Sequence, residues 1–365
     1  MATIDKPLPN VDNDKAQEEI VEIENKKAAE VIDTPTGPVE VAMDEMGGAE
    51  VSFDPNAVNI DPTQDHFANL AETLEDGVLE PLGNKMIDQY NEYKESRGDW
   101  EDTYKNGLEL LGFKYERRTE PFRGASGVNH PVLAEAVTQF QAQAYKELLP
   151  ANGPVHTQIV GLADRAREDQ SNRVKEFMNY QLMDVMKEYE PEFDQMLFYL
   201  PLAGSAFKKV YYDELLGRAV SKFVPADDLV VPYTATSLED AEAIIHVIKI
   251  SENELRKQQV AGFYKDIELG EPPVTENQLE DKKLEVEGIA KDGQEDQYTL
   301  YEVHTNLDLE GYEDMGEDGE PTGIKLPYIV TVSQAGNKVL SIRRNYKAMD
   351  PLKKKVNYFV QFQFL

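Results

Sequence analysis

The fold of this chain is decided by residues 189–233, which read YEPEFDQMLFYLPLAGSAFKKVYYDELLGRAVSKFVPADDLVVPY. Apolar residues recur at steps of three and four up to Leu200, which predicts a helix that ends at the Pro-Leu-Ala-Gly break. Residues 206–212 and 219–224 are rich in β-branched and aromatic residues and flank a glycine turn, so they predict a β hairpin. The stretch holds no nucleophile–base pair, no metal-ligand spacing and no phosphate-binding loop, which is typical of a scaffold.

The sequence on either side predicts more helices first and more strands later. Amphipathic stripes predict helices over 63–90, 100–111, 130–149 and 165–189, and the last of these places Val174, Phe177 and Met178 on a stripe that we expect to be core. Towards the end, residues 298–306, 324–332, 338–344 and 356–365 predict strands. We therefore expect an α+β fold of long amphipathic helices and antiparallel β hairpins.

Composition limits the classes of protein. The chain has 365 residues and no cysteine, which excludes disulfide frameworks, thiolate zinc sites and cysteine nucleophiles. No apolar run reaches the roughly 18 residues needed to cross a bilayer. The first residues, MATIDKPLPNVDND, lack the basic and apolar regions of a signal peptide, so we expect a soluble protein that stays inside the cell and makes no membrane contact.

Negative charge is concentrated in two segments. The net charge is −32, of which residues 1–54 contribute −10 and residues 266–320 contribute −16. A strongly acidic surface repels nucleic-acid phosphate, so the chain is not expected to be an ordinary high-affinity DNA-binding protein. The charge fits either a solvated, solubilising surface or a surface that polyanions pass without sticking.

Three regions follow from these patterns. Residues 1–54 are rich in acids, proline and glycine with one aromatic residue, which predicts a disordered acidic tail. Residues 55–200 predict a mainly helical region. Residues 201–365 predict a β-rich region with an acidic insertion of low order at 266–296.

Three blocks of sequence resemble the portal (head–tail connector) proteins of tailed bacteriophages, in particular the large portals of short-tailed phages. The first block is residues 122–150, FRGASGVNHPVLAEAVTQFQAQAYKELLP. The second is the opening stretch with its PLAGSAFKKVYYDE core, and the third is VPADDLVVPY at 224–233, where the chain is similar to the family's wing region. The resemblance extends over about residues 62–365, continues more weakly through 298–344, and none of its blocks is a chemical motif.

The resemblance implies a wing-like fold and a function without catalysis or cofactors. Portals are ring-shaped homo-oligomers, usually dodecamers, at one vertex of the capsid, and they are assembled in the host cytoplasm. They nucleate head assembly with the major capsid and scaffold proteins, dock the terminase, bind tail adaptors, and pass double-stranded DNA through a central channel without sequence specificity. A ring of this kind needs two different contact patches on each subunit.

The chain also differs from the family in its extent. Family members usually continue through stem and clip elements, whereas this chain ends at Leu365 within a predicted strand. We expect a piece of a longer portal, in which case these residues alone assemble poorly, and no channel-lining residue is assigned.

Candidate sites in the sequence are few. The five histidines share no metal-ligand spacing, so each is expected to be a capped or half-buried residue, and no catalytic, cofactor-binding or metal residue is predicted. Asp227 and Asp228 with the acidic insertion lack the spacing of a calcium loop. Two basic clusters stand out in the acidic chain. Each cluster has the same alternatives: a solvated surface, a contact with a neighbouring subunit, or a contact with packaged DNA. Their residues are Lys114, Arg117, Arg118 and Arg123 in the first, and Arg343 and Arg344 with Lys347 and Lys353–Lys355 in the second.

Two other classes of function are open. One is another acidic virion adaptor or scaffold protein without a DNA channel. The other is an enzyme, such as a glycosidase with an Asp/Glu pair. The sequence disfavours the enzyme because the motifs that accompany catalysis are missing.

Overall fold

A computed structural model describes the side chains of most of residues 66–364. The described residues are 66–111, 122, 130–161, 164–213, 216–272, 278–287, 297–316 and 320–364, together with the strands of residues 29–53. The chain divides into two units, Met1–Asp65 and His66–Leu365.

The first unit contains a three-stranded antiparallel sheet. Its strands are β1 (Ala29–Thr34), β2 (Gly37–Met43) and β3 (Ala49–Phe53), in the order β1-β2-β3. These strands lie within residues 1–54, for which the composition predicts a disordered acidic tail. Valine alternates with other residues at Val39 and Val41, and this period of two favours strand despite the acidic composition. The rest of the predicted tail lies outside the described residues.

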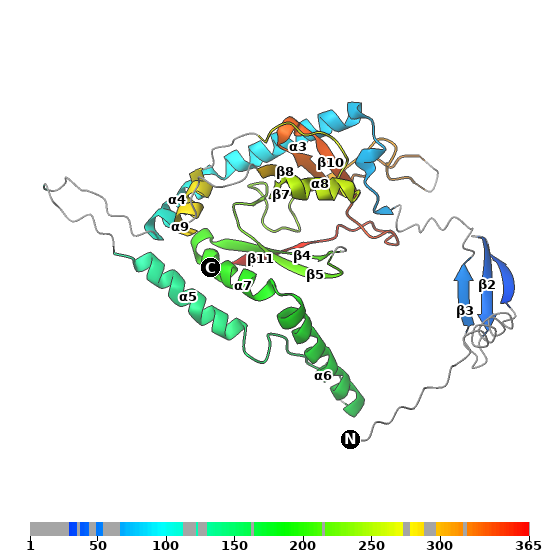
Figure 1. Cartoon of the computed structure of the whole chain (residues 1–365), viewed down its shortest axis with the longest axis horizontal. Helices are drawn as coiled ribbons and strands as arrows, with labels where there is room; N and C mark the ends of the chain where they lie inside the picture. The colour runs from blue at the N-terminus through cyan, green and yellow to red at the C-terminus, as the bar shows by residue number, and fades with distance from the viewer. Residues whose placement is uncertain are drawn as a thin grey trace, which may run out of the picture. The chain divides into compact units, whose positions relative to one another are not determined.

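The second unit is built on two antiparallel sheets, which confirms the mixed α+β class (Figure 1). The larger sheet has the order β10-β9-β8-β7-β6, and the smaller has the order β11-β4-β5. The strands are β4 (Ser205–Asp213), β5 (Arg218–Val224), β6 (Leu229–Val230), β7 (Ala243–Ser251), β8 (Gln297–Leu307), β9 (Leu326–Ser333), β10 (Val339–Arg344) and β11 (Phe359–Gln363).

The helices lie mainly in the first half of this unit. They are α3 (Asp76–Ser96), α4 (Gly98–Leu111), α5 (Val132–Leu148), α6 (Arg165–Tyr180), α7 (Tyr189–Ala203), α8 (Glu252–Val260) and α9 (Gln278–Glu287), with short turns η1 (Leu70–Glu72), η2 (Gln181–Val185, a π turn) and η3 (Ala335–Asn337). The predicted helical and β-rich regions thus lie in one unit.

The opening stretch folds as its pattern predicts. Helix α7 ends at Gly204, whose φ of 81° is the left-handed conformation that glycine adopts without strain. The chain then enters the β4–β5 hairpin, with Phe207 opposite Val224. Val224–Leu229 turns back to place β6 beside β7 in the larger sheet. One continuous segment therefore joins the two sheets.

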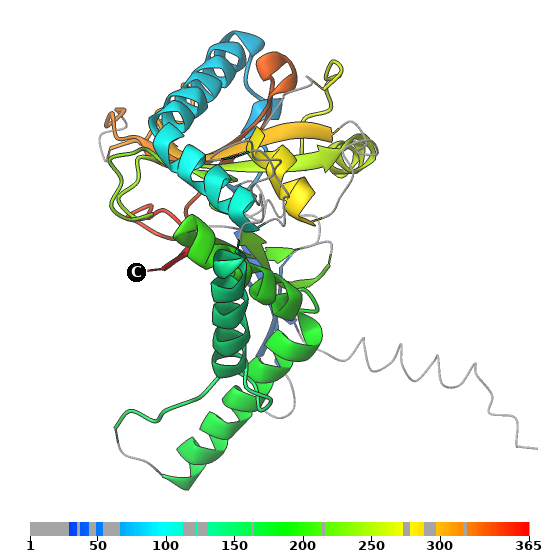
Figure 2. The same ribbon diagram turned by 90° about the vertical axis from the view of Figure 1, so that its left-hand side faces the viewer.

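The two faces of the larger sheet pack against different layers (Figure 2). On β8, alternate residues point to opposite faces. Tyr301 and Val303 belong to a core with α3, whereas Leu300 belongs to a core with Leu255 of α8. Helix α7 packs against α5 and the smaller sheet. Glu302 and His304 share the face of Leu300 and meet the smaller sheet.

Two predictions about local structure were wrong. The insertion 266–296 was expected to have low order, but it contains α9, whose Leu279 is buried against α4 and α7 because one apolar side chain reaches their common core. Helix 165–189 was expected to bury its stripe, but α6 ends at Tyr180 and has no buried residue. Val174, Phe177 and Met178 are exposed because no element of the described chain covers them.

Gly83 provides a direct test of the packing of α3 on the larger sheet. A Cβ atom at Gly83 would lie 2.2 Å from the backbone carbonyl oxygen of Asn337, in the turn between β9 and β10. Backbone cannot move away as a side chain can, so we expect Gly83→Ala to lower the free energy of unfolding by about 1–3 kcal/mol.

Gly107→Ala in α4 is the matched control, because nothing lies within 4 Å of its Cβ position. It should raise stability by about 0.5–1 kcal/mol, since alanine favours a helix interior. Thermal unfolding of both variants tests this prediction. Equal melting temperatures would contradict the close approach of α3 to the turn between β9 and β10.

Candidate functional site: a cation-lined pocket and a buried ionic cluster

The first predicted basic cluster lies in a part of the chain that the structure does not describe. Lys114, Arg117, Arg118 and Arg123 lie outside the described residues. Their contact with a neighbouring subunit or with DNA stays a prediction.

The structure places Arg343 and Arg344 at the end of β10, where they bind the start of the second unit. Arg343 donates to the carbonyl oxygens of Phe67 (2.6 Å) and Phe263 (2.9 Å), and Arg344 donates to that of His66 (3.1 Å). The Arg343 guanidinium also lies 4.4 Å from the Phe263 ring centre. These bonds fix residues 66–67 to the larger sheet, and the predicted contact with another molecule stays a prediction.

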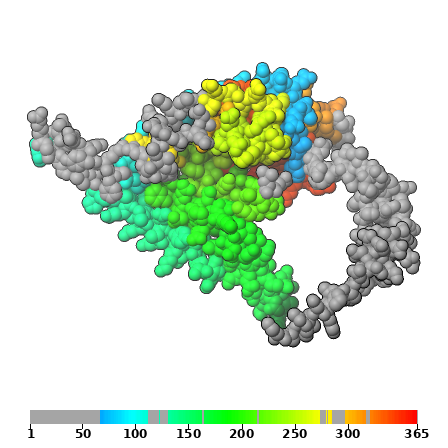
Figure 3. Space-filling model, in the orientation of Figure 1, coloured from blue at the N-terminus to red at the C-terminus, as the bar shows by residue number. Residues whose placement is uncertain are grey.

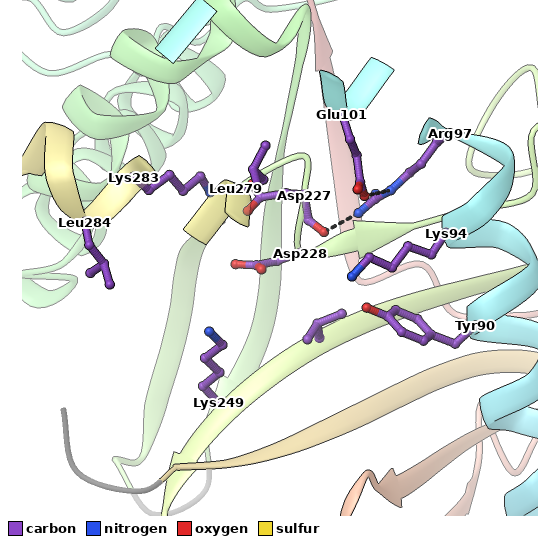
Figure 4. Close-up of a pocket in the computed structure, with 11 residues that line it drawn as sticks. Tyr90, Lys94, Arg97, Glu101, Asp227, Asp228, Lys249, Leu279, Lys283 and Leu284 are labelled. Atoms are coloured by element: carbon purple, nitrogen blue, oxygen red, sulfur yellow. Dashed lines mark hydrogen bonds and ion pairs between the residues drawn. The ribbon is translucent and has the colours of Figure 1, made fainter. Parts of the chain in front are cut away.

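A pocket of about 210 Å³ lies between α3, α4, α9 and the edge of the larger sheet (Figure 4). Charged side chains of both signs reach into it from these elements and from the Val224–Leu229 turn. The basic ones are Lys94, Arg97, Lys249 and Lys283, the acidic ones are Glu101, Asp227 and Asp228, and the remainder are Tyr90, Val247, Leu279 and Leu284.

Arg97 is the centre of this pocket. It follows α3, and its guanidinium donates to the carbonyl oxygens of Ala226 (3.1 Å), Asp227 (2.7 Å) and Leu229 (3.1 Å). Its Nε donates to Glu101 at 2.9 Å. The planar, five-donor guanidinium suits such a set of acceptors, which a lysine could not satisfy. Arg97 therefore holds the turn that joins the smaller sheet to β6.

The other charges in the pocket are largely balanced. Lys283 of α9 pairs with the Asp227 carboxylate, and both side chains are mostly buried. The Lys94 ammonium lies 5.8 Å from the Tyr90 ring centre. Paired charges of this kind fasten α9 and the 224–229 turn to α3 and α4. These pairs make the pocket a structural clamp between the helices and the turn.

A second cluster of charges is buried between the two sheets. Lys209 of β4 donates to both carboxylate oxygens of Glu302 on β8, at 2.6 and 2.7 Å. His304 Nε2 lies 2.8 Å from the same carboxylate, and His246 Nδ1 of β7 lies 3.9 Å from it. The rings of both histidines contact Phe359 of β11 edge-on. These four titratable side chains thus connect β4 of the smaller sheet with β7 and β8 of the larger sheet.

Burial and the opposite charges set the protonation states in this cluster. Burial alone would raise the pKa of Glu302, but Lys209 and the hydrogen bond with His304 hold that pKa well below its usual value. Burial lowers the pKa of His246 to about 3, against the opposing effect of Glu302, and burial also lowers the pKa of His304. The cluster is therefore a carboxylate–ammonium pair flanked by neutral imidazoles.

Lys208, the neighbour of Lys209, points to the other side of the smaller sheet. Its ammonium lies 4.1 Å from the Tyr189 ring centre and 5.1 Å from that of Phe193. Burial lowers its pKa to about 8, although Glu192 and Glu188 act in the opposite direction. Lys208 joins α7 to β4 by cation–π contact.

Sequence reasoning missed most of these residues. Arg97, Lys209 and Glu302 were not among the candidate residues. Each histidine was expected to be capped or half-buried, which fits His246 but not His304, whose exposed fraction is 1%. Glu302 and His304 are two residues apart, so they share a face of a strand. That spacing was the available signal, but the pairing of β4 residues with β8 residues across two sheets leaves no trace in the sequence.

Two kinds of feature are absent from the described residues. No group of three or more His, Cys, Asp or Glu side chains there is arranged to hold a metal ion. No helix in the same residues combines the length and apolar character needed to cross a membrane.

Comparison with known proteins does not assign the chain to a family. No family model matches the chain, and no curated protein matches it.

Proposed function

We propose that this chain is the wing part of a bacteriophage portal protein, a ring subunit at the capsid vertex through which double-stranded DNA is packaged and ejected. The observation that carries the proposal is the resemblance of 189–233, with its helix, glycine break, hairpin and VPADDLVVPY turn. The structure is compatible, because these residues form one continuous α7–β4–β5–β6 segment. The partners proposed are further copies of the chain, the terminase, capsid and scaffold proteins, and a tail adaptor.

The charges of the chain support a non-enzymatic role. A net charge of −32 disfavours tight binding of DNA phosphate, as a conduit for DNA requires. The Lys209–Glu302 and Lys283–Asp227 pairs each join separate elements of the fold, which is a structural use of charge. Arg97 and Glu302 make the wing rigid.

Ring formation is the expected result that tests this proposal. The full-length protein should form rings with a central hole in negative-stain microscopy, with a native mass equal to a fixed multiple of the subunit. A monomer at every concentration would contradict the portal assignment. An assembly without a hole would favour the alternative, an acidic adaptor or scaffold protein of the virion.

A further inference from the structure

The two sheets of the second unit have largely separate apolar cores. Figures 1 and 2 show the sheets one above the other, and in Figure 3 the green segments that carry the smaller sheet lie below the yellow-green α8. Among the described residues, the cores around Met86 of α3 and Leu255 of α8 contain the larger sheet alone, and the core around Met196 of α7 contains the smaller alone. The remaining core, which includes Ile244 and Phe359, contains strands of both. This shared core and the buried ionic cluster therefore join the sheets.

The histidines of the ionic cluster lie in this joint. Phe359 of β11 covers both imidazole rings, with its ring centre 5.6 Å from that of His246 and 5.2 Å from that of His304. His246 Nδ1 is buried and makes no hydrogen bond with any residue that the structure describes. The smaller sheet supplies Phe359 on one side of the rings and Lys209 on another. Both imidazoles are therefore kept from water by contact between the sheets.

A proton on either imidazole is poorly accommodated in the closed joint. The other charged groups that face the two rings are Lys209 of β4, Lys222 of β5, Lys355 before β11 and Glu302 of β8. Three of them are cations, and the Glu302 carboxylate is already bound by Lys209 through both oxygens. The Tyr358 ring lies 5.8 Å from that of His304, but burial raises the pKa of Tyr358, so it does not titrate in acid. A charged imidazole is therefore more stable in water than between the sheets.

Two ties between the sheets lie outside the ionic cluster. The turn from β5 to β6 is held by Arg97, which donates to three of its carbonyl oxygens. The chain from β10 to β11 is closed by the Val356 N–H, which donates to the Asn345 carbonyl oxygen at 3.0 Å. An opened joint would therefore keep the sheets attached at these two places.

We propose that the interface between the two sheets is an acid-sensitive joint, in which protonation of His246 and His304 releases the smaller sheet from the larger while each sheet keeps its own core. Partial opening of this kind is expected where parts of a protein form separate cooperative units. It differs from unfolding of the whole chain, because the cores around Met86 and Met196 stay formed. The joint acts within one copy of the chain and does not depend on the proposed ring.

The population of the opened state should rise as the pH falls below 6.5. His246 has a pKa of about 3 in the closed joint and an ordinary value of 6.5, so the opened state takes up the proton first. Between pH 7 and pH 5 this difference raises the ratio of opened to closed molecules about 25-fold. His304, whose pKa burial also lowers, acts in the same direction.

A buried cysteine can report the opening, because the chain has no native cysteine. Val220 of β5 is opposite Tyr211 of β4, so it shares the face of Lys209, and it is 1% exposed. Val220→Cys should react with a dipyridyl disulfide when the joint opens. Val332→Cys, in the core between α3 and the larger sheet, is the control, because this position becomes reactive only when that core unfolds.

Each labelling rate is divided by that of a free thiol at the same pH. We expect a normalised rate roughly tenfold or more higher at position 220 than at position 332, and an increase of about 25-fold at position 220 from pH 7 to pH 5. Adding His246→Phe should reduce this increase by about fivefold or more. If Val220→Cys does not fold, Thr331→Cys gives the same readout, since Thr331 is opposite Glu302 in the larger sheet and is 3% exposed.

Two results would overturn the acid-sensitive joint. Equal normalised rates at the joint position and at position 332 would mean that the sheets separate only when the whole chain unfolds. An increase between pH 7 and pH 5 that His246→Phe leaves intact would mean that other groups drive the opening.

Discussion

Glu302→Gln is expected to lower the free energy of unfolding by about 3–5 kcal/mol. The substitution keeps the shape of the side chain but removes the charge that Lys209 contacts through both carboxylate oxygens. The Lys209 ammonium would then be left between the sheets without its counter-ion. Breaking a buried pair by removing one partner is far more costly than the pair's net contribution, because the remaining charge has lost its water. Denaturant unfolding followed by circular dichroism measures the loss.

Glu254→Gln is the matched control for this prediction. Glu254 pairs with Lys257 at 3.1 Å on α8, but both side chains are largely exposed. Surface pairs contribute about 0–1 kcal/mol, so this variant should be nearly as stable as the parent protein. If both variants lose a similar amount of unfolding free energy, the Lys209–Glu302 pair is effectively solvated and does not join the sheets.

Mild acid is expected to destabilise the protein through the histidines of the same cluster. His246 has a pKa of about 3 in the folded protein and an ordinary value of 6.5, so the unfolded chain takes up a proton first as the pH falls. Stability contributed by the neutral ring is therefore complete above pH 6.5 and decreases below it. Between pH 7 and pH 5 the loss from His246 alone is about 2 kcal/mol. His304, whose pKa is also lowered, changes stability in the same direction.

Glu302 extends this loss to lower pH. Its folded pKa lies well below the ordinary 4.5, so its contribution is present above that value and is lost as the pH falls below it. His246→Phe keeps an aromatic ring against Phe359 and should reduce the slope of stability against pH between 7 and 5. His130→Phe, which replaces an exposed histidine outside the cluster, is the control for the substitution itself. If the free energy of unfolding of His246→Phe falls with pH as steeply as that of the parent, the His246 ring does not cause the loss of stability in mild acid.

Parts of the fold with strong local signals could be predicted from the sequence. The β4–β5 hairpin was predicted within one residue of its ends, and α7 extends three residues beyond the predicted Leu200, to Ala203. Gly204 and Gly217 adopt positive φ at the breaks in the pattern. The strands of the larger sheet follow β-branched runs such as that of β7. By contrast, α9 lies in a segment whose acidic composition concealed one anchoring leucine, Leu279.

The candidate sites were much less predictable. Arg343 and Arg344 stood out by charge, yet Arg343 binds carbonyl oxygens 80 and 276 residues away in the chain and Arg344 binds one 278 residues away. Phe177 and Met178 stood out by periodicity, yet a periodic stripe shows only that one face is apolar and not which surface covers it.

The sequence by itself determined the strongly patterned segments, such as the β4–β5 hairpin, and the excess of negative charge, because these depend on composition and on neighbours a few residues apart. Only the tertiary structure decided that Glu302 meets Lys209 and that α6 buries none of its side chains against the part of the chain that the structure describes. Contacts between residues far apart depend on how layers stack. Stacking is fixed by the fit of whole surfaces, which no short stretch of residues encodes.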